Sequence, residues 1–219
     1  MKSSAFVGVS LDSNRFTRER VNFAIPHILS KHADLQFVLA DRLLTYNKLL
    51  ACHDGLTRLD FSAATSRIEK RSGDINQFLS NEVSRLSKSD KSRVTIATWD
   101  DYCDHHHARI ARTLAIAYSS IPEFRQCVRN DVETHLLGNG QSHIDRGITR
   151  RLCASYVLEE TAMIMRITEL SERPFDYYPG DQIETLESLY EDRFSSAGLT
   201  VDALVGHPKS RLFNALSLI

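Results

Sequence analysis

Ser10 is the residue near the start of the chain whose type and setting could do chemistry. The apolar run 5–9 ends at this serine, and a polar turn at 12–14 leads into a helical pattern. In an α/β sheet, a serine at the carboxyl end of a strand lies beside the crevice where ligands bind. Ser10 is therefore a candidate nucleophile that would carry an acyl group. Taken alone, the local pattern fits a turn residue at the start of a helix better than it fits a nucleophile.

The sequence around Ser10 excludes three common site motifs. The residue two positions after the serine is Asp12 and not glycine, so this is not the nucleophile elbow of hydrolases. The glycines that a dinucleotide fingerprint or a phosphate-binding P-loop requires are also missing. Gly8, two positions before the serine, would let backbone or ligand approach closely at the strand end.

A second pair with chemical potential is Tyr156 and Glu160, which stand four residues apart. On a helix these residues share one face and can act together. Val157, Met163 and Ile164 supply apolar neighbours. Such surroundings can move the pKa of a carboxylate toward neutrality, so that it serves as a general base. The alternative is an ordinary surface pair of a tyrosine and a glutamate.

Two tyrosines stand near the end of the last predicted strand, in the run Asp176-Tyr177-Tyr178-Pro179. A position at the end of a parallel strand would place Tyr178 on the same edge of the sheet as Ser10. Adjacent tyrosines in a strand often serve packing, and that alternative stays open.

A basic surface is predicted on the long helical segment after the second strand. Arg67, Lys70 and Arg71 are spaced i, i+3 and i+4 and so share a face. Arg85 and Lys88 follow the first two by 18 residues, which is five turns of about 3.6 residues. A basic ridge of this kind suits a phosphate backbone. A solvated charged face is the alternative, because three acidic residues on the same segment dilute the ridge.

The three consecutive histidines at 105–107 raise the question of a metal site. Adjacent histidines cannot all point at one ion from a regular element. No cysteine or glutamate stands four residues after any of these histidines to complete a zinc-enzyme motif. We therefore expect a polar loop and helix start here, and no metal.

The strands that position these residues alternate with helices along the chain. Apolar runs predict strands at 4–10, 35–40, 93–99 and 175–178. Because no two strands are joined by a hairpin turn, this order predicts βαβ units and a central, mostly parallel sheet covered on both faces. The fold class is a Rossmann-like, three-layer α/β sandwich with a helix-rich second half.

Helical patterns fill the segments between the strands. Pro26 should kink or split the first helix, and Asp41 can cap the second. The first expected helix is capped by Asn14 or Thr17 and runs to about 31. The others span 43–53, 62–86, 107–118, 122–137 and 145–172, with a last one from about 182.

Composition limits the class of protein and its partners. The 219 residues are 42% hydrophobic and 25% charged with a net charge of −1, which is typical of a soluble protein without a global attraction to nucleic acid. Four cysteines without a CxxC pair, and no signal peptide, predict reduced thiols in a cytoplasmic protein. The apolar runs are shorter than the ~20 residues of a membrane span. We expect one domain over 1–219.

Taken together and in this order, the motifs resemble those of the cyclodipeptide synthases, a tRNA-dependent family that makes 2,5-diketopiperazines. The shared features are a Gly-x-Ser turn after the first strand, a basic helix after the second, a Tyr-x-x-x-Glu helix and a late Tyr-Pro. The resemblance runs from about residue 4 to residue 194. It implies a Rossmann-like fold similar to the catalytic domain of class Ic aminoacyl-tRNA synthetases.

The resemblance also implies roles for individual residues. Ser10 matches the family nucleophile, and Tyr178 matches its late catalytic tyrosine. Tyr156 and Glu160 match the tyrosine and glutamate of the catalytic helix. The substrate-binding candidates are Phe6, Gly8, Val38, Ser13 and Pro179. Ser13 stands where the better-known branch has Asn, and Pro179 where it has His, which resembles the second branch.

The implied reaction is a ping-pong transfer that joins the aminoacyl groups of two aminoacyl-tRNAs. Ser10 would carry first an aminoacyl and then a dipeptidyl ester, and ring closure would release the product. An ester is an activated acyl donor, so a Ser-His-Asp relay is less necessary than for an amide. The resemblance implies no cofactor, no metal and no membrane partner, and a monomer is favoured.

Two other functions remain open from the sequence alone. The chain could be a Rossmann-like serine esterase that uses Ser10, although no histidine stands convincingly at the end of a later strand. It could also be a non-catalytic module that binds tRNA or a nucleotide. In that second case Ser10 would only cap a helix.

Overall fold

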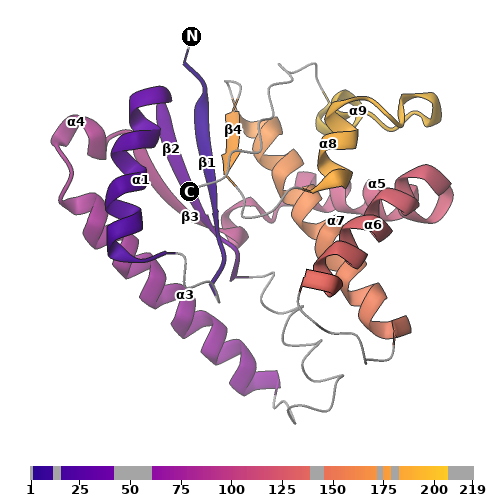
Figure 1. Cartoon of the computed structure of the whole chain (residues 1–219), viewed down its shortest axis with the longest axis horizontal. Helices are drawn as coiled ribbons and strands as arrows, with labels where there is room; N and C mark the ends of the chain where they lie inside the picture. The colour runs from indigo at the N-terminus through magenta and orange to yellow at the C-terminus, as the bar shows by residue number, and fades with distance from the viewer. Residues whose placement is uncertain are drawn as a thin grey trace.

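A parallel four-stranded sheet forms the centre of the molecule, in the order β3-β2-β1-β4 (Figure 1). The computed structural model describes residues 2–11, 16–41, 61–138, 146–171, 175–178 and 183–206. The strands are β1 (Ser4–Val9), β2 (Asp34–Leu39), β3 (Val94–Thr98) and β4 (Phe175–Tyr178). Every neighbouring pair among them is parallel, as the sequence predicts. Their carboxyl ends therefore meet at one edge of the sheet.

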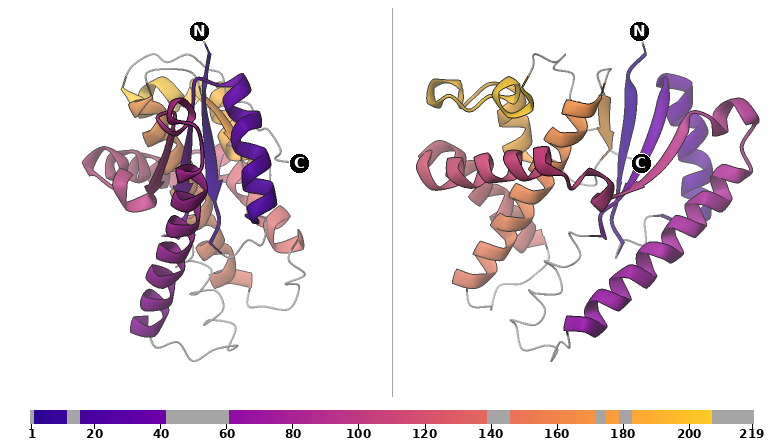
Figure 2. Two further views of the ribbon diagram at one scale, coloured as in Figure 1. Left: turned by 90° about the vertical axis from the view of Figure 1, so that its left-hand side faces the viewer. Right: turned by 180° about the vertical axis from the view of Figure 1, so that it is seen from behind.

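Helices α1 (Arg18–Lys31) and α3 (Phe61–Ser84) cover one face of this sheet (Figures 1 and 2). Val7 and Val9 of β1 are fully buried on this side. They belong to one apolar cluster with residues of both helices, such as Leu79 of α3. Because side chains alternate across a strand, the residues between them in β1 face the opposite side.

Pro26 does not split the first helix, which was one of the two effects expected of it. Helix α1 runs as one element from Arg18 to Lys31. Both Pro26 and Asn22, whose carbonyl loses its usual N–H donor, are exposed. Water can bond that carbonyl, so the missing hydrogen bond costs less than it would in a buried helix. Of the two caps that the sequence offers, the structure shows Thr17, whose side chain accepts a hydrogen bond from the N–H of Arg20, while Asn14 lies outside the described residues.

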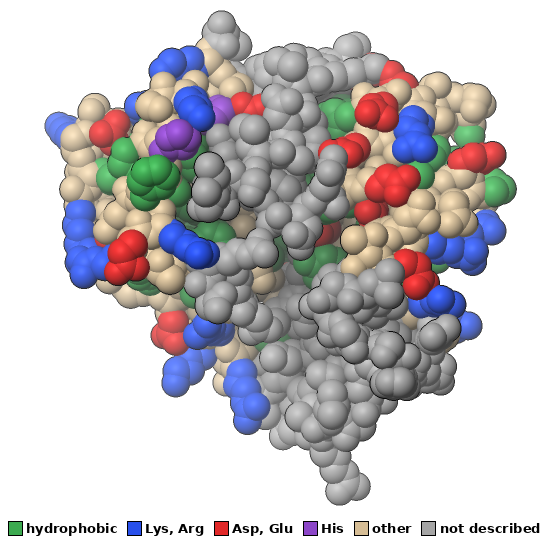
Figure 3. Space-filling model, viewed as in Figure 1, with side chains coloured by type: hydrophobic (Ala, Val, Ile, Leu, Met, Phe, Trp, Pro, Cys, Tyr) green, Lys and Arg blue, Asp and Glu red, His purple; other side chains and the backbone are tan. Residues whose placement is uncertain are grey.

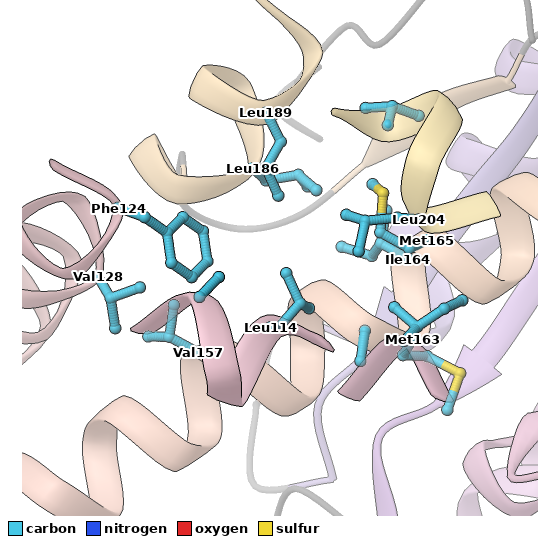
Figure 4. Close-up of a cluster of buried hydrophobic side chains, with 14 of the residues drawn as sticks. Leu114, Phe124, Val128, Val157, Met163, Ile164, Met165, Leu186, Leu189 and Leu204 are labelled. Carbon is cyan, nitrogen blue, oxygen red and sulfur yellow. The ribbon is translucent and has the colours of Figure 1, made fainter. Parts of the chain in front are cut away.

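A layer of helices covers the second face of the sheet. Its elements are η1 (Trp99–Tyr102), α5 (His105–Ser120), α6 (Pro122–Gly138), α7 (Arg146–Leu170), α8 (Glu184–Tyr190), η2 (Ser195–Ala197) and α9 (Val201–Val205). Phe6 of β1 and Val38 of β2 join the apolar cluster that these helices form. Figure 4 shows Leu114, Phe124 and Leu186, from α5, α6 and α8, in that cluster.

Helix α7 is the centre of this layer. Eight consecutive residues, 161–168, are buried, which is typical of a helix surrounded by others on all sides. The hydroxyls of Thr161 and Thr168 donate to the carbonyls of Val157 and Ile164, at 2.7 and 2.8 Å. Buried polar groups on α7 thus find partners within the helix itself. The apolar surroundings predicted for Tyr156 and Glu160 are present on the same helix.

Several smaller expectations can be compared with the structure. Cys103, Cys127 and Cys153 are free thiols, as predicted, while Cys52 lies outside the described residues. The helix expected at 43–53 also lies outside them. None of the helices that the structure describes is long and apolar enough to cross a membrane.

A buried polar cluster ties β4 to β1 and α1 at the amino-terminal edge of the sheet. The Ser3 hydroxyl lies 2.9 Å from Nδ1 of His32 and donates to Oδ2 of Asp176 at 3.0 Å. His32 Nδ1 lies 3.3 Å from the same carboxylate oxygen. Burial lowers the pKa of His32 below its usual value, and the attraction of Asp176 only partly opposes this effect. The folded protein therefore favours the neutral imidazole.

We expect this cluster to make the fold sensitive to acid. The pKa of His32 is lower in the folded chain, so the unfolded chain binds the extra proton more readily. Its stabilising contribution is present above pH ~6.5 and is lost as the pH falls toward the folded pKa. Urea unfolding at about pH 7.5 and about pH 5.5 should show a larger loss for the wild type than for His32→Asn. Equal losses in the two proteins would contradict the prediction.

Candidate active site

Ser10 lies exposed at the carboxyl edge of the sheet, directly after β1. The backbone N–H of Ala40, after β2, donates to the carbonyl of Val9 at 2.9 Å, which fixes the end of β1 beside the end of β2. Phe6, Gly8 and Ser10 follow one alternation, and Phe6 is buried in the cluster on the α7 side. The strand therefore brings Ser10 to the edge that the sequence predicts, on the side of the sheet that α7 covers.

The residues predicted to flank a pocket lie side by side on that face. Gly8 pairs with Val38 across β1 and β2. Phe6 and Val38 are buried, and Gly8 is half-buried. Because Gly8 has no side chain, another group can approach the backbone closely at this position, two residues before Ser10.

Tyr156 and Glu160 lie on α7 with the predicted spacing. Both are half-buried, and Tyr156 packs against the apolar cluster that contains Phe6 and Val38. Tyr156 of the helical layer and Phe6 of the strand that ends at Ser10 thus meet at the same apolar cluster.

Tyr178 is the last residue of β4 and pairs with Val7 of β1. It lies on the same edge of the sheet as Ser10, as predicted, but the register places it opposite a residue three positions before the serine. The structure describes the backbone of Tyr178 and not its side chain. Ser13 and Pro179 lie outside the described residues.

Arg71 is a contact of the Ser10 turn that the sequence did not predict. Its Nε donates to the carbonyl of Leu11, the residue after the serine, at 2.9 Å. The next residue on α3, Ser72, donates to Oδ2 of Asp41 beyond β2 at 3.4 Å. The middle of α3 therefore holds the turns that follow β1 and β2.

The basic ridge is shorter than the sequence predicts. The five cations are exposed, and Figure 3 shows Lys and Arg side chains gathered over α3. However, α3 ends at Ser84, and Lys88 begins the separate helix α4 (Lys88–Lys91). The Ser87 side chain caps α4 by accepting from the N–H of Asp90, which favours a new helix over continuation.

The five-turn spacing therefore does not apply to Arg85 and Lys88. Arg85 also forms an ion pair with Glu82, which is buried and is contacted by Arg18 at 3.4 Å. The cations that remain on one face of α3 are Arg67, Lys70 and Arg71.

Tyr102 is a second neighbour of the site that sequence reasoning did not single out. Its hydroxyl accepts a hydrogen bond from the amide of Gln36 on β2, the strand position next to Phe6 of β1. Burial, with a smaller effect of Asp101, raises the pKa of Tyr102 to about 12. The phenol is therefore neutral at physiological pH and acts as a hydrogen-bonding group. The polar Gln36 within an apolar strand was the available signal.

Comparison with known proteins rests on structure alone. No protein-family model matches the chain, and no curated protein matches it. Solved structures do. A cyclodipeptide synthase from Staphylococcus haemolyticus superposes with a TM-score of 0.71 at 16% identity, over 92% of this chain and 87% of that one. This chain has the cyclodipeptide synthase fold.

Two further structures agree with that fold. A Mycobacterium tuberculosis protein, described as showing that cyclodipeptide synthetases are related to type I tRNA synthetases, gives a TM-score of 0.67 at 14% identity over 86% of this chain and 78% of its own. A cyclodipeptide synthase from Candidatus Glomeribacter gigasporarum, bound to Phe-tRNA, gives 0.58 at 16% identity over 89% and 84%. The expected Rossmann-like α/β class, similar to class I synthetases, is thus confirmed.

Proposed function

We propose that the protein is a tRNA-dependent cyclodipeptide synthase, an aminoacyltransferase that forms both peptide bonds of a 2,5-diketopiperazine. The observation that carries this proposal is the placement of Ser10. It stands exposed at the end of β1, in the same alternation as Phe6, whose side chain belongs to the cluster that Tyr156 of α7 packs against. The shared fold of the cyclodipeptide synthases supports the same function.

In the first half-reaction, the Ser10 oxygen attacks the ester carbonyl of an aminoacyl-tRNA. The bond to the tRNA ribose oxygen breaks, that oxygen takes up a proton, and the aminoacyl group becomes an ester of Ser10. The donor is already activated, so neither ATP nor a cofactor is needed, and the serine needs less assistance than an amide substrate would demand.

In the second half-reaction, the amine of the bound aminoacyl group attacks the ester of a second aminoacyl-tRNA. A peptide bond forms, the second tRNA leaves, and a dipeptidyl ester remains on Ser10. The new terminal amine then attacks that ester. This step forms the second peptide bond, releases the Ser10 hydroxyl and frees the cyclic dipeptide.

Glu160 and the tyrosines would manage the amine during these steps. The Glu160 carboxylate would hold the ammonium group of the bound aminoacyl ester and take its proton before attack. Tyr156 and Tyr178 would orient the amine and relay protons. Phe6, Gly8 and Val38 would flank the first aminoacyl group. In the better-known branch, an Asn stands at the position of Ser13 and a His at the position of Pro179. We therefore place this chain in the other branch, in which Pro follows the late tyrosine.

The exposed cations of α3 would bind tRNA phosphates, with Arg85 and Lys88 as neighbouring contacts. The substrates are cytoplasmic, so we expect the enzyme in the cytoplasm. We also expect it to be active as a monomer. Arg71 would have two tasks, because it also donates to the carbonyl beside Ser10. It would connect tRNA binding to the position of the nucleophile.

Lys70→Ala and Arg71→Ala are expected to separate these two tasks. Lys70→Ala should weaken tRNA binding and reduce its dependence on salt, with turnover at saturating tRNA unchanged. Arg71→Ala should also lower turnover by about 2- to 10-fold, the worth of one hydrogen bond that positions the Ser10 turn. Binding by filter retention at several salt concentrations and single-turnover kinetics measure the two effects. Unchanged turnover in Arg71→Ala would remove its positioning role.

The function itself is tested by expressing the chain in a bacterium and searching the medium for cyclic dipeptides by mass spectrometry. We expect one or a few diketopiperazines that a vector control lacks. Purified protein incubated with charged tRNA should gain the mass of one aminoacyl group on the peptide that contains Ser10. A serine esterase would hydrolyse simple esters without releasing cyclic dipeptide, and a binding module would form no adduct.

A further inference from the structure

A cluster of three different metal-binding side chains lies beside the candidate active site. The thiol of Cys103, the imidazole of His107 and the carboxylate of Glu159 bring one ligand atom each to within 4.8 Å of one another. Cys103 follows η1, His107 is in the first turn of α5, and Glu159 is on α7. Cys103 and His107 stand four residues apart in the sequence, but nothing in the sequence points to Glu159, which comes from a distant helix.

The distances in the cluster are close to those of a coordinated ion. Nε2 of His107 lies 3.6 Å from Oε1 of Glu159. Zinc bonds of about 2.0–2.3 Å at tetrahedral angles place neighbouring ligand atoms about 3.3–3.7 Å apart. The histidine and carboxylate therefore already stand at the required separation. Sγ of Cys103 lies within 4.8 Å of a ring nitrogen of His107 and of a carboxylate oxygen of Glu159.

The surroundings hold these side chains in a partly dry site. The side chains of His107 and Glu159 are 6% and 11% exposed, and Cys103 is half-buried. Nε1 of Trp99 donates to Oε1 of Glu159 at 3.4 Å and so orients the carboxylate. Orientation of a ligand by a neighbouring hydrogen bond is a regular feature of metal sites.

A network of charges fixes α5 against α7 next to the cluster. Asp104 caps α5 by accepting from the N–H of His107 at 2.9 Å. Arg166 of α7 forms an ion pair with Asp104 at 2.5 Å and with Glu169 at 2.6 Å. The backbone that carries His107 is therefore held in place opposite Glu159 before any ion binds.

The geometry points to a zinc site formed by Cys103, His107 and Glu159, with the fourth coordination position left to water or another small ligand. A soft thiolate, an imidazole and a carboxylate together suit Zn²⁺ better than the oxygen-preferring Mg²⁺ or Ca²⁺. The ion joins the segment after β3 to α7, next to Glu160 and three residues after Tyr156. It therefore ties α7 to the first turn of α5. The site rests on these contacts and not on the proposed function.

Metal analysis of the full-length chain without an affinity tag tests this site. After incubation with Zn²⁺ and dialysis, the wild type should retain one zinc ion per chain. Titration with Co²⁺ should produce a thiolate-to-cobalt charge-transfer band and the strong visible absorption of a tetrahedral site. Cys103→Ser should lose the charge-transfer band, and its zinc affinity should fall by more than the about 10- to 100-fold that loss of an outer hydrogen bond costs. Zinc should raise the urea midpoint of the wild type and not of this variant.

Matched variants separate the site from incidental binding. His106→Asn, one position from His107, and Cys127→Ala should bind zinc as the wild type does. Glu159→Gln should behave like Cys103→Ser. Circular dichroism of each variant shows whether it is folded. His107→Asn should also lose zinc binding, and if this variant does not fold, zinc binding by the conservative variant Cys103→Ser decides whether the site exists. Less than one zinc per chain in the wild type, or an unchanged cobalt spectrum in Cys103→Ser, would overturn the proposal, and neither result bears on cyclic dipeptide formation.

Discussion

Replacing Ser10 with alanine is expected to lower cyclic dipeptide formation by about 10³-fold or more, as for other enzymes that lose their nucleophile. The physical reason is that the serine oxygen is the atom to which both acyl intermediates are attached. Without it, the amine of one aminoacyl-tRNA would have to attack another in a bimolecular step, and the advantage of a held, oriented acyl group would be lost. Ser10 is exposed, so the change should leave the fold intact.

The measurement combines product yield in the medium with mass analysis of the purified variant after exposure to charged tRNA. Ser10→Ala should give neither product nor aminoacyl adduct and should still bind tRNA. Ser10→Cys restores a nucleophile and should form the adduct as a thioester. Ser119→Ala is the matched control, because Ser119 is an exposed serine whose hydroxyl donates to the carbonyl of Ala115 in its own helix. Wild-type yield from Ser10→Ala would disprove the covalent mechanism.

The second large effect concerns stability, at Arg166. Arg166→Met is expected to reduce the free energy of unfolding by about 3 kcal/mol. The guanidinium is largely buried and lies between Oδ2 of Asp104 at 2.5 Å and Oε2 of Glu169 at 2.6 Å. Removing the cation leaves two carboxylates near each other at the contact between α5 and α7. Burial raises the pKa of Asp104, but hydrogen bonds from His107 and Arg166 together lower it to about 2, so this carboxylate is charged at neutral pH.

Urea unfolding followed by circular dichroism measures the loss. Arg150→Met is the matched control, since Arg150 pairs with Glu133 at 2.8 Å and both side chains are about half exposed, at 49% and 46%. An exposed pair of this kind contributes at most about 1 kcal/mol. Equal losses in the two variants would show that the network around Arg166 does not hold α5 against α7.

Local sequence signals predicted most of the elements correctly. The apolar runs of β1, β2 and β3 have the length of buried strands, and the apolar residues of α1 repeat with the 3.6-residue period of a helix. Ser10 could be placed at the carboxyl edge because every strand in a parallel sheet ends on the same side. The expectation that Pro26 could split the first helix was wrong. Pro26 is exposed, so water can replace the hydrogen bond that the helix loses there.

The sequence by itself thus determined the class of fold, the position of Ser10 at the strand end and the shared helix of Tyr156 and Glu160. Only the tertiary structure decided which distant groups meet. It joined Arg71 to the carbonyl of Leu11, and it brought Glu159 to Cys103 and His107. The reason is that periodicity records which face of an element is buried, whereas it carries no information on which other element packs there. Those contacts follow from the order of the strands and the packing of α5 on α7.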